Sequence, residues 1–210
     1  MTLLSKLLSL FPSLTLGLSA LSVIYSLHSP WGLILCFFWL YGLPVFAYRL
    51  HTWFYPLKSG ISYLQGSDYS PWWGGHQFQL IYIAFPVLET WLRLVPGLFS
   101  IWLRLWGAQI GNQVYWTPVL EIADRGLLTI GDGVVFGHRV GLYSHIVKPR
   151  RDNLMLYLKP ISIGSGSFVG AGSYIGPGAT IAAGSYLKAD SKIYPNAAID
   201  SAQKGKSCAG

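Results

Sequence analysis

Residues 163–193 read IGSGSFVGAGSYIGPGATIAAGSYLKADSKI, and this stretch decides the fold. An aliphatic residue recurs at every sixth position, and a small residue stands four positions after each of them. The aliphatic positions are Ile163, Val169, Ile175, Ile181, Leu187 and Ile193. A period of six fits neither a helix, which has about 3.6 residues per turn, nor a single strand, which alternates. It indicates a solenoid whose triangular coil takes three such hexads.

In a solenoid of this kind the aliphatic residue points inward, the small residue fills the space beside it, and glycine permits the corner. The same period occurs earlier in the chain at Ile110, Trp116 and Ile122, and then at Ile130, Phe136 and Leu142. We expect the second of these runs to stack beneath Ile163, Val169 and Ile175, in that order. A glycine-rich β-sandwich is the alternative, which six consecutive hexads disfavour.

Two interruptions of the period carry information. Between Ile122 and Ile130 the spacing grows by two residues, which predicts a small bulge. Between Val147 and Ile163 the period is lost, which predicts a loop over Lys148–Pro160 with a basic start and an apolar second half. Loops that leave a rigid solenoid are where sites are usually built. The apolar half equally suits a subunit contact or a membrane contact.

The composition predicts contact with lipid. Hydrophobic residues make up 52% of the 210 residues and charged residues 11%, against about a quarter charged in ordinary soluble domains. Lys and Arg outnumber Asp and Glu by 15 to 8, which suits anionic lipid headgroups or a phosphate-bearing substrate. A basic run interleaved with aromatics is missing, so nucleic acid is not an expected partner. The two cysteines, Cys36 and Cys208, cannot form a disulfide framework or a metal cage by themselves.

Two apolar stretches open the chain, Leu7–Leu27 and Trp31–Tyr48, and each is close to the roughly 20 residues that a spanning helix needs. The connector His28-Ser29-Pro30 predicts a turn, so we expect a transmembrane helical hairpin. A signal peptide is one alternative, but an Ala-x-Ala-like cleavage site is missing. A pair of buried core helices is the other, and no large amphipathic partner is visible to cover them.

The charges that flank the hairpin predict its orientation. Lys6 precedes the first stretch, Arg49 and Lys58 follow the second, and the connector has no Lys or Arg. The positive-inside rule therefore predicts an integral membrane protein with both ends, and the domain after the hairpin, on the cytoplasmic side.

The segment from Gln77 to Trp106 is apolar again, but Pro86 and Pro96 predict kinks. Glu89 and Arg93 are spaced to pair on one helical face. We expect broken helices at the membrane surface, with three tryptophans at headgroup depth, namely Trp91, Trp102 and Trp106. A third span is the alternative, which ionisable groups at its centre disfavour. The predicted divisions are a hairpin over 1–58, an interfacial or re-entrant linker over 59–106, a β-helix domain over 107–200 and a flexible tail over 201–210.

Short motifs in the second half of the chain resemble those of a known family. They are Ile130-Gly131-Asp132, Ser144-His145, Pro160-Ile161-Ser162-Ile163-Gly164, Val169-Gly170 and Ile175-Gly176-Pro177-Gly178. Through them the C-terminal half resembles the hexapeptide-repeat acyltransferases, such as the sugar O-acetyltransferases. The resemblance implies a mainly β fold, a left-handed parallel β-helix, and transfer of an acyl group, acetyl by this likeness, from acyl-coenzyme A. The hairpin, the Arg/Trp-rich helix and Gly107-Ala108-Gln109-Ile110-Gly111 are together similar to the membrane-associated C-terminal region of poly-lysine-synthetase-type peptide synthetases.

The resemblance also implies roles for single residues. His145 is the implied general base for an acceptor hydroxyl or amine, because imidazole titrates near neutral pH. Asp124 is the implied acidic residue that orients this histidine or binds the acceptor. The backbone N–H of Ala171, after Gly170, is the implied donor to the thioester oxyanion, and Phe168 is the implied aromatic beside the acyl donor.

Other positions depart from the family pattern. The usual Thr-Lys-Asp turn reads Tyr194-Pro195-Asn196, and the closing Asn-Pro-Ala is missing. In their place we expect Lys188 and Lys192 to supply charge for the coenzyme pyrophosphate. His145 stands two residues earlier than in the family, which leaves His138 as the alternative base. The expected stacking of the coils places His145 beneath Gly178, where bare backbone leaves room for substrate.

The expected partners follow from the same likeness. We expect a lipid bilayer, a homotrimer, acyl-coenzyme A as co-substrate, no metal, and a small-molecule or lipid-linked acceptor. A zinc enzyme of the γ-carbonic-anhydrase type is a competing class, but it needs three converging histidines and the repeat contains His138 and His145 alone. A non-catalytic β-helix scaffold or assembly subunit is the third class, which the missing closing motif favours. The fold by itself does not identify the acceptor.

Overall fold

The computed structural model describes residues 2–201 and divides the chain into two compact units. One unit contains residues 1–58, 62–84 and 149–155, and the other contains residues 59–61, 85–148 and 156–210. Most of the predicted tail, residues 202–210 with Cys208, lies outside the described residues.

The first unit is a helical hairpin followed by a third helix. Its elements are α1 (Leu3–Leu8), α2 (Phe11–Ser26), α3 (Trp31–Phe37), the π-helix η1 (Phe38–Gly42), α4 (Leu43–Phe54) and α5 (Pro71–Ala84). The arms of the hairpin, Leu3–Ser26 and Trp31–Phe54, are 24 residues long each, and only 17% and 11% of their most apolar windows is buried. The predicted hairpin is therefore present with longer arms. By length and composition alone, both arms are candidates for membrane spans.

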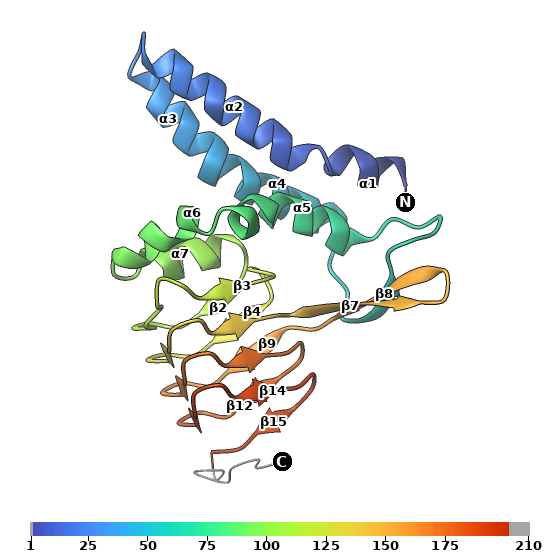
Figure 1. The fold of residues 1–210 in the computed structure, drawn as a ribbon, viewed down its shortest axis with the longest axis vertical. Helices are drawn as coiled ribbons and strands as arrows, with labels where there is room; N and C mark the ends of the chain where they lie inside the picture. Colours follow the sequence, from blue (N-terminus) through green and yellow to red (C-terminus); the bar gives the residue numbers. More distant parts are fainter. Residues whose placement is uncertain (1, 202–210) are drawn as a thin grey trace. The chain divides into compact units, whose positions relative to one another are not determined.

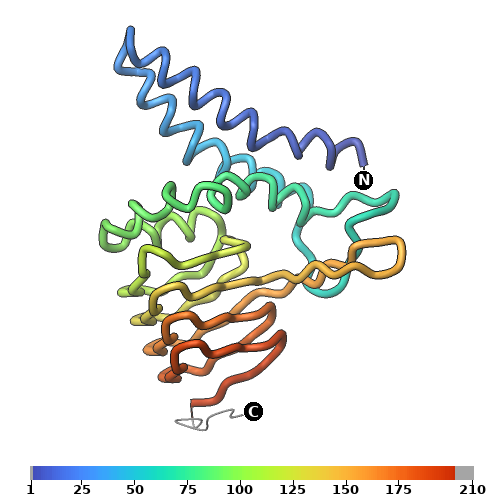
Figure 2. Tube along the Cα trace, in the orientation of Figure 1, coloured from blue at the N-terminus to red at the C-terminus, as the bar shows by residue number. Residues whose placement is uncertain are grey.

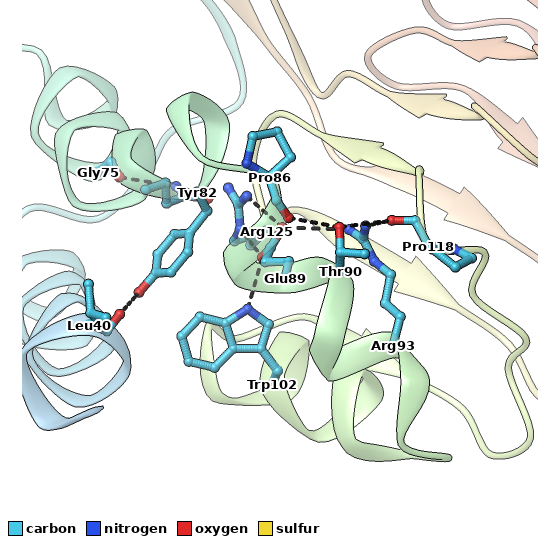
Figure 3. Close-up of polar contacts among 11 residues, drawn as sticks. Leu40, Gly75, Tyr82, Pro86, Glu89, Thr90, Arg93, Trp102, Pro118 and Arg125 are labelled. Carbon is cyan, nitrogen blue, oxygen red and sulfur yellow. Dashed lines mark hydrogen bonds and ion pairs between the residues drawn. The ribbon is translucent and has the colours of Figure 1, made fainter. Parts of the chain in front are cut away.

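Small residues let the arms of the hairpin approach closely, as Figure 1 shows for α2 and α3. A Cβ added to Gly32 would lie 2.4 Å from the backbone nitrogen of Ser26. Close backbone approach at small residues is typical of helices that associate in lipid. The Trp39 indole donates to Ser22 Oγ at 3.0 Å, and Tyr82 of α5 donates to the Leu40 carbonyl (Figure 3).

The second unit is a stack of coils made of very short parallel strands (Figure 2). Sheet 1 contains β2 (Gln109–Ile110), β4 (Leu128–Ile130), β9 (Ile161–Ile163), β12 (Thr180–Ile181) and β15 (Ala198–Ile199). Sheet 2 contains β5 (Val135–Phe136), β10 (Phe168–Val169) and β13 (Tyr186–Leu187). Sheet 3 contains β3 (Glu121–Ile122), β6 (Gly141–Leu142), β11 (Tyr174–Ile175) and β14 (Lys192–Ile193). The chain visits sheets 1, 2 and 3 in turn, which fits a β-helix-like fold.

The strand pairing confirms the stacking that the hexads predict. Ile130 pairs with Ile163, Phe136 with Val169, and Leu142 with Ile175. All six side chains are at most 2% exposed, so they form the core of the coils. In the regular part Ser162 pairs with Thr180, 18 residues later, as three hexads require. The corner glycines Gly172, Gly178 and Gly184 have φ of +71°, +73° and +69°, a conformation that favours glycine.

The segment expected as a loop is a β-hairpin instead. It consists of β7 (His145–Arg150) and β8 (Asn153–Leu158), and β8 also pairs with β1 (Gly60–Tyr63). Leu156 and Leu158 are buried, at 1% and 2% exposed. The prediction of a loop over 148–160 was wrong because a β-hairpin does not follow a six-residue period and so is not revealed by one.

Three short helices close the first coil. They are α6 (Val87–Thr90), the 3-10 helix η2 (Trp91–Leu94) and α7 (Leu98–Leu105). The Trp116 indole donates to Ser100 Oγ of α7 at 2.9 Å, and its ring stacks on Phe136 inside the coils. Trp102 and Trp106 are 5% and 0% exposed. The prediction that these two tryptophans lie at headgroup depth was therefore wrong, because they cover the apolar end that every solenoid must cap.

Candidate functional site

His145 and Asp124 meet at one corner of the coils. His145 Nδ1 lies 2.7 Å from Asp124 Oδ2. The carboxylate is buried, at 3% exposed, whereas the imidazole side chain is 19% exposed. A carboxylate on Nδ1 fixes the orientation of the ring and assigns Nε2 to any chemistry with a substrate. The two residues therefore have the geometry of a general-base dyad.

Both residues lie where the chain departs from the period. The corner that leads from sheet 3 to sheet 1, here called the His145 corner, comprises residues 123–127, 143–145 with 159–160, 176–179 and 194–197. Asp124 begins a turn, closed by a hydrogen bond from Leu127 N to Asp124 O at 3.2 Å, that holds the two extra residues. His145 is the first residue of the β7–β8 hairpin, one coil further on. Two insertions stacked on one corner thus bring these side chains together.

Lys159, and not His145, lies beneath Gly178. The Gly178 N–H donates to the Lys159 carbonyl at 3.2 Å, because the chain has left the stack at Ser144 and rejoins it at Lys159. The expectation for His145 was wrong because it counted the hairpin as part of the coil. Lys159 Nζ and Tyr157 Oη both donate to Asn196 Oδ1, at 2.8 and 2.7 Å, which joins this corner to the next coil.

The residues expected to contact the acyl donor lie on a different corner. The corner between sheets 2 and 3, here called the His138 corner, holds His138, Gly170, Ala171 and Lys188. Gly172 N donates to the His138 carbonyl at 2.8 Å and Asp190 N donates to the Ala171 carbonyl at 2.8 Å, so these residues stack in register. Within one copy of the chain, the dyad and the Ala171 N–H are therefore separated by the width of sheet 3.

Two further predicted residues lie on the outer faces of the sheets. Phe168 is 37% exposed on sheet 2 and stacks on Tyr186, with 5.1 Å between ring centroids. Lys192 starts β14 on sheet 3, opposite Tyr174. Lys192 and Phe168 thus flank the His138 corner from its two sides.

The turn that carries Asp124 is held by a buried ion pair that sequence reasoning missed. Arg125 donates to both carboxylate oxygens of Glu89, Nε to Oε1 at 2.6 Å and Nη2 to Oε2 at 2.9 Å (Figure 3). Trp102 Nε1 donates to Oε1 at 2.9 Å, and Arg93 Nη2 lies 3.5 Å from Oε2. The predicted pairing of Glu89 with Arg93 is confirmed. The closer partner is Arg125, which no helical spacing could indicate.

Burial and charge act against each other in this cluster. Burial by itself would raise the pKa of the Glu89 carboxyl, but the charge and hydrogen bonds of Arg125, the charge of Arg93 and the Trp102 indole hold that pKa below its ordinary value. Burial lowers the pKa of Arg93 to about 10, although Glu89 opposes this and Arg125 adds to it. Glu89 and Arg93 are therefore both charged at neutral pH.

Tyr143 is another residue near the dyad that the sequence did not single out. Its hydroxyl donates to the Glu121 carboxylate, and its ring stacks on Tyr174 with 4.6 Å between centroids. Burial, followed by the hydrogen bond and charge of Glu121, raises the pKa of the Tyr143 hydroxyl. The side chain fills the space above Gly141, where an added Cβ would lie 2.2 Å from the ring. Among residues 2–201 there is no group of three or more His, Cys, Asp or Glu that could hold a metal ion.

Comparisons with known proteins give structural similarity only. No protein-family model and no curated protein matches the chain. A hexapeptide-repeat-containing acetyltransferase from Vibrio cholerae is similar at 22% identity and a TM-score of 0.36, over 44% of this chain and 57% of that chain. Its complex with acetyl coenzyme A gives 22% identity and a TM-score of 0.35, over 44% and 54%. Serine acetyltransferase isoform 3 from Entamoeba histolytica, in complex with cysteine, gives 13% identity and a TM-score of 0.34, over 85% and 64%. The chain thus spans just over half the length of the bacterial proteins.

The Glu89 cluster predicts a dependence of stability on acid. A carboxylate whose pKa is depressed in the folded state stabilises the fold above its ordinary pKa of 4.5, and this contribution is lost as the pH falls through the folded pKa. We expect the melting temperature of wild type to fall relative to that of Glu89→Leu/Arg125→Met as the pH drops below 4.5. From pH 5 to 7 the difference between the two should stay constant. Thermal unfolding in detergent from pH 3 to 7 measures it. Parallel curves over the whole range would contradict the prediction.

Proposed function

We propose that this protein is a membrane-anchored acyltransferase that moves an acyl group from acyl-coenzyme A to a hydroxyl or amine. The contact of 2.7 Å between Asp124 and His145 carries the proposal. It provides the one thing that a weak nucleophile needs, a fixed acceptor for its proton. The choice of acyl-coenzyme A as donor rests on the hexad motifs and their family resemblance.

The proposed reaction balances with the residues at hand. His145 Nε2 takes the proton of the acceptor as its oxygen or nitrogen attacks the thioester carbonyl carbon. Asp124 stabilises the imidazolium that forms. The carbon–sulfur bond then breaks, and the departing coenzyme A thiolate takes the proton from His145. The N–H of Ala171 is the proposed donor to the oxyanion, with Phe168 beside the donor and with Lys188 and Lys192 near its phosphates.

A site of this kind requires more than one copy of the chain. The dyad lies on the His145 corner and Ala171 lies on the His138 corner, across sheet 3. In a ring of copies around a rotation axis, the His145 corner of one copy faces a different corner of its neighbour. We propose a homotrimer in which one copy supplies the base and the next supplies the oxyanion donor.

The two arms of the hairpin support the proposed membrane anchor. Many of their large apolar side chains face outward, including Leu14, Leu21, Leu33 and Phe46, which are 55%, 64%, 54% and 64% exposed. Apolar surface of this extent is covered by lipid in an integral membrane protein. The flanking Lys6, Arg49 and Lys58 favour a cytoplasmic location for both ends.

The first prediction of this proposal concerns the base. We expect His145→Ala to lower the rate of acyl transfer by on the order of a hundred- to ten-thousand-fold, because a general base is removed, and His138→Ala to lower it much less. The assay is consumption of acetyl-coenzyme A with membrane extract as the source of acceptor. Circular dichroism is the control for folding. Equal rates for wild type and His145→Ala would refute the mechanism, and failure of wild type to bind or consume the thioester would favour the scaffold.

The second prediction concerns the shared site. Ala171→Pro removes the N–H without disturbing the turn, because Pro177 occupies the same place before Gly178 in this chain. We expect Ala171→Pro to abolish transfer and Ala183→Pro, the same change on the third corner, to preserve it. When His145→Ala and Ala171→Pro are co-expressed in equal amounts, about a quarter of the sites should regain both groups, by random assembly. If the mixture stays inactive, or if mass measurement in detergent finds only monomer, the shared site is wrong.

The third prediction concerns the anchor. We expect the full-length protein to stay in the membrane fraction without detergent, and a cysteine placed at Ser29 to react only with reagents outside the cytoplasm. Recovery in the soluble fraction would contradict the anchor. Labelling of that cysteine from the cytoplasmic side alone would contradict the orientation.

A further inference from the structure

Arg125 is among the most deeply buried charged groups of the described residues, at 1% exposed, and its partner Glu89 is 3% exposed. It follows Asp124 directly and occupies the turn that the Leu127 N to Asp124 O hydrogen bond closes. Asp124 points to His145, whereas the Arg125 side chain is held by both oxygens of Glu89. One short turn therefore carries the proposed dyad on one residue and a buried anchor on the next.

We propose that the Glu89–Arg125 ion pair is a positioning device that holds the Asp124 turn, and through it His145, in the geometry needed for proton transfer. The inference rests on the proposed function and adds two residues that touch neither acceptor nor thioester.

The reason lies in the cost of burying charge. Moving two charges out of water is costly, and apolar residues of similar volume often replace such a pair without loss of stability. Stability alone is therefore a poor reason for this pair. The pair fixes the orientation of the Arg125 side chain, because a guanidinium that donates twice to one carboxylate is held in the plane of that carboxylate. A turn anchored in this way holds its neighbouring carboxylate within the narrow range that catalysis requires.

Glu89 is itself held from three sides, which makes the anchor rigid. Trp102 of α7 donates to one oxygen, and Arg93 of η2 approaches the other. Arg93 Nη1 also donates to the Pro118 carbonyl at 2.6 Å (Figure 3). The helices that cap the first coil thus hold the same carboxylate that Arg125 binds. A displacement of the turn by about 1 Å would be expected to cost about a hundredfold in rate.

The test is a double-mutant cycle on a protein whose transfer depends on His145. Glu89→Leu/Arg125→Met replaces the pair by apolar groups, and Arg125→Lys keeps the charge but loses the second hydrogen bond. We expect Glu89→Leu/Arg125→Met to lower kcat about a hundredfold, with the KM for acetyl-coenzyme A nearly unchanged. Arg125→Lys should lower kcat less. In an Asp124→Asn background the same changes should have almost no further effect, because the carboxylate they position is already gone.

Thr90→Val is the matched control, since the Thr90 hydroxyl also joins the cap to Pro118, through a hydrogen bond of 3.4 Å, and donates to backbone carbonyls rather than to the Glu89 carboxylate. It should leave kcat unchanged, and melting temperatures of all variants report their folding. Additive losses in the Asp124→Asn background would overturn the inference, as would unfolding of every Glu89 or Arg125 variant at the assay temperature. Transfer that does not depend on His145 would instead refute the proposed function, so the two failures are distinguishable.

Discussion

Backbone hydrogen bonds between strands 18 residues apart are the constraint on which the second unit depends. Once Ser162 is paired with Thr180 and Phe168 with Tyr186, every inward position of the regular coils is determined. A coil that contains extra residues must release them at a corner, because insertion within a strand would turn the core residues outward. The two insertions of this chain, at Asp124 and after Ser144, both leave the stack at the His145 corner. The proposed Asp124–His145 dyad is made from residues at the points where the chain departs from the repeat.

The cap over the first coil has a second consequence. Its apolar residues close the end of the core, and its one buried carboxylate, Glu89, is placed where Arg125 can reach it. An uncompensated Arg125 at that position would be strongly destabilising. The insertion at Asp124 and the helix that begins at Val87 therefore depend on each other, although 36 residues separate Glu89 from Arg125. Residues 85–106, the second half of the predicted linker, belong to the second unit, whereas residues 62–84 belong to the first.

The six-residue period of the sequence predicted the stacking of the regular coils. The aliphatic hexads gave the correct partners for Ile130, Phe136 and Leu142, and the irregular spacing after Ile122 located the turn that carries Asp124. It could not reveal that Asn153–Leu158 forms a strand, because a six-residue period gives no information on a hairpin. It also could not distinguish Trp102 and Trp106 in a protein core from tryptophans in lipid, because both surroundings are apolar. The partner of Arg125 depends on tertiary packing, which no local spacing reports.

The different roles proposed for the two corners also bear on which acceptor the protein selects. The His138 corner belongs to the regular part of the coils, where backbone N–H groups repeat at fixed intervals. On the proposed function, such regular groups suit the acyl donor, a thioester that is the same for every acceptor. The His145 corner is irregular, with a hairpin, a buried anchor and the Tyr143–Glu121 contact beside the dyad. Irregular segments vary without disturbing the stack. On the proposed function, the acceptor is therefore selected at the His145 corner. On this proposal, Tyr143, which precedes the hairpin, and Tyr157, which lies on β8, help to decide which hydroxyl or amine reaches His145.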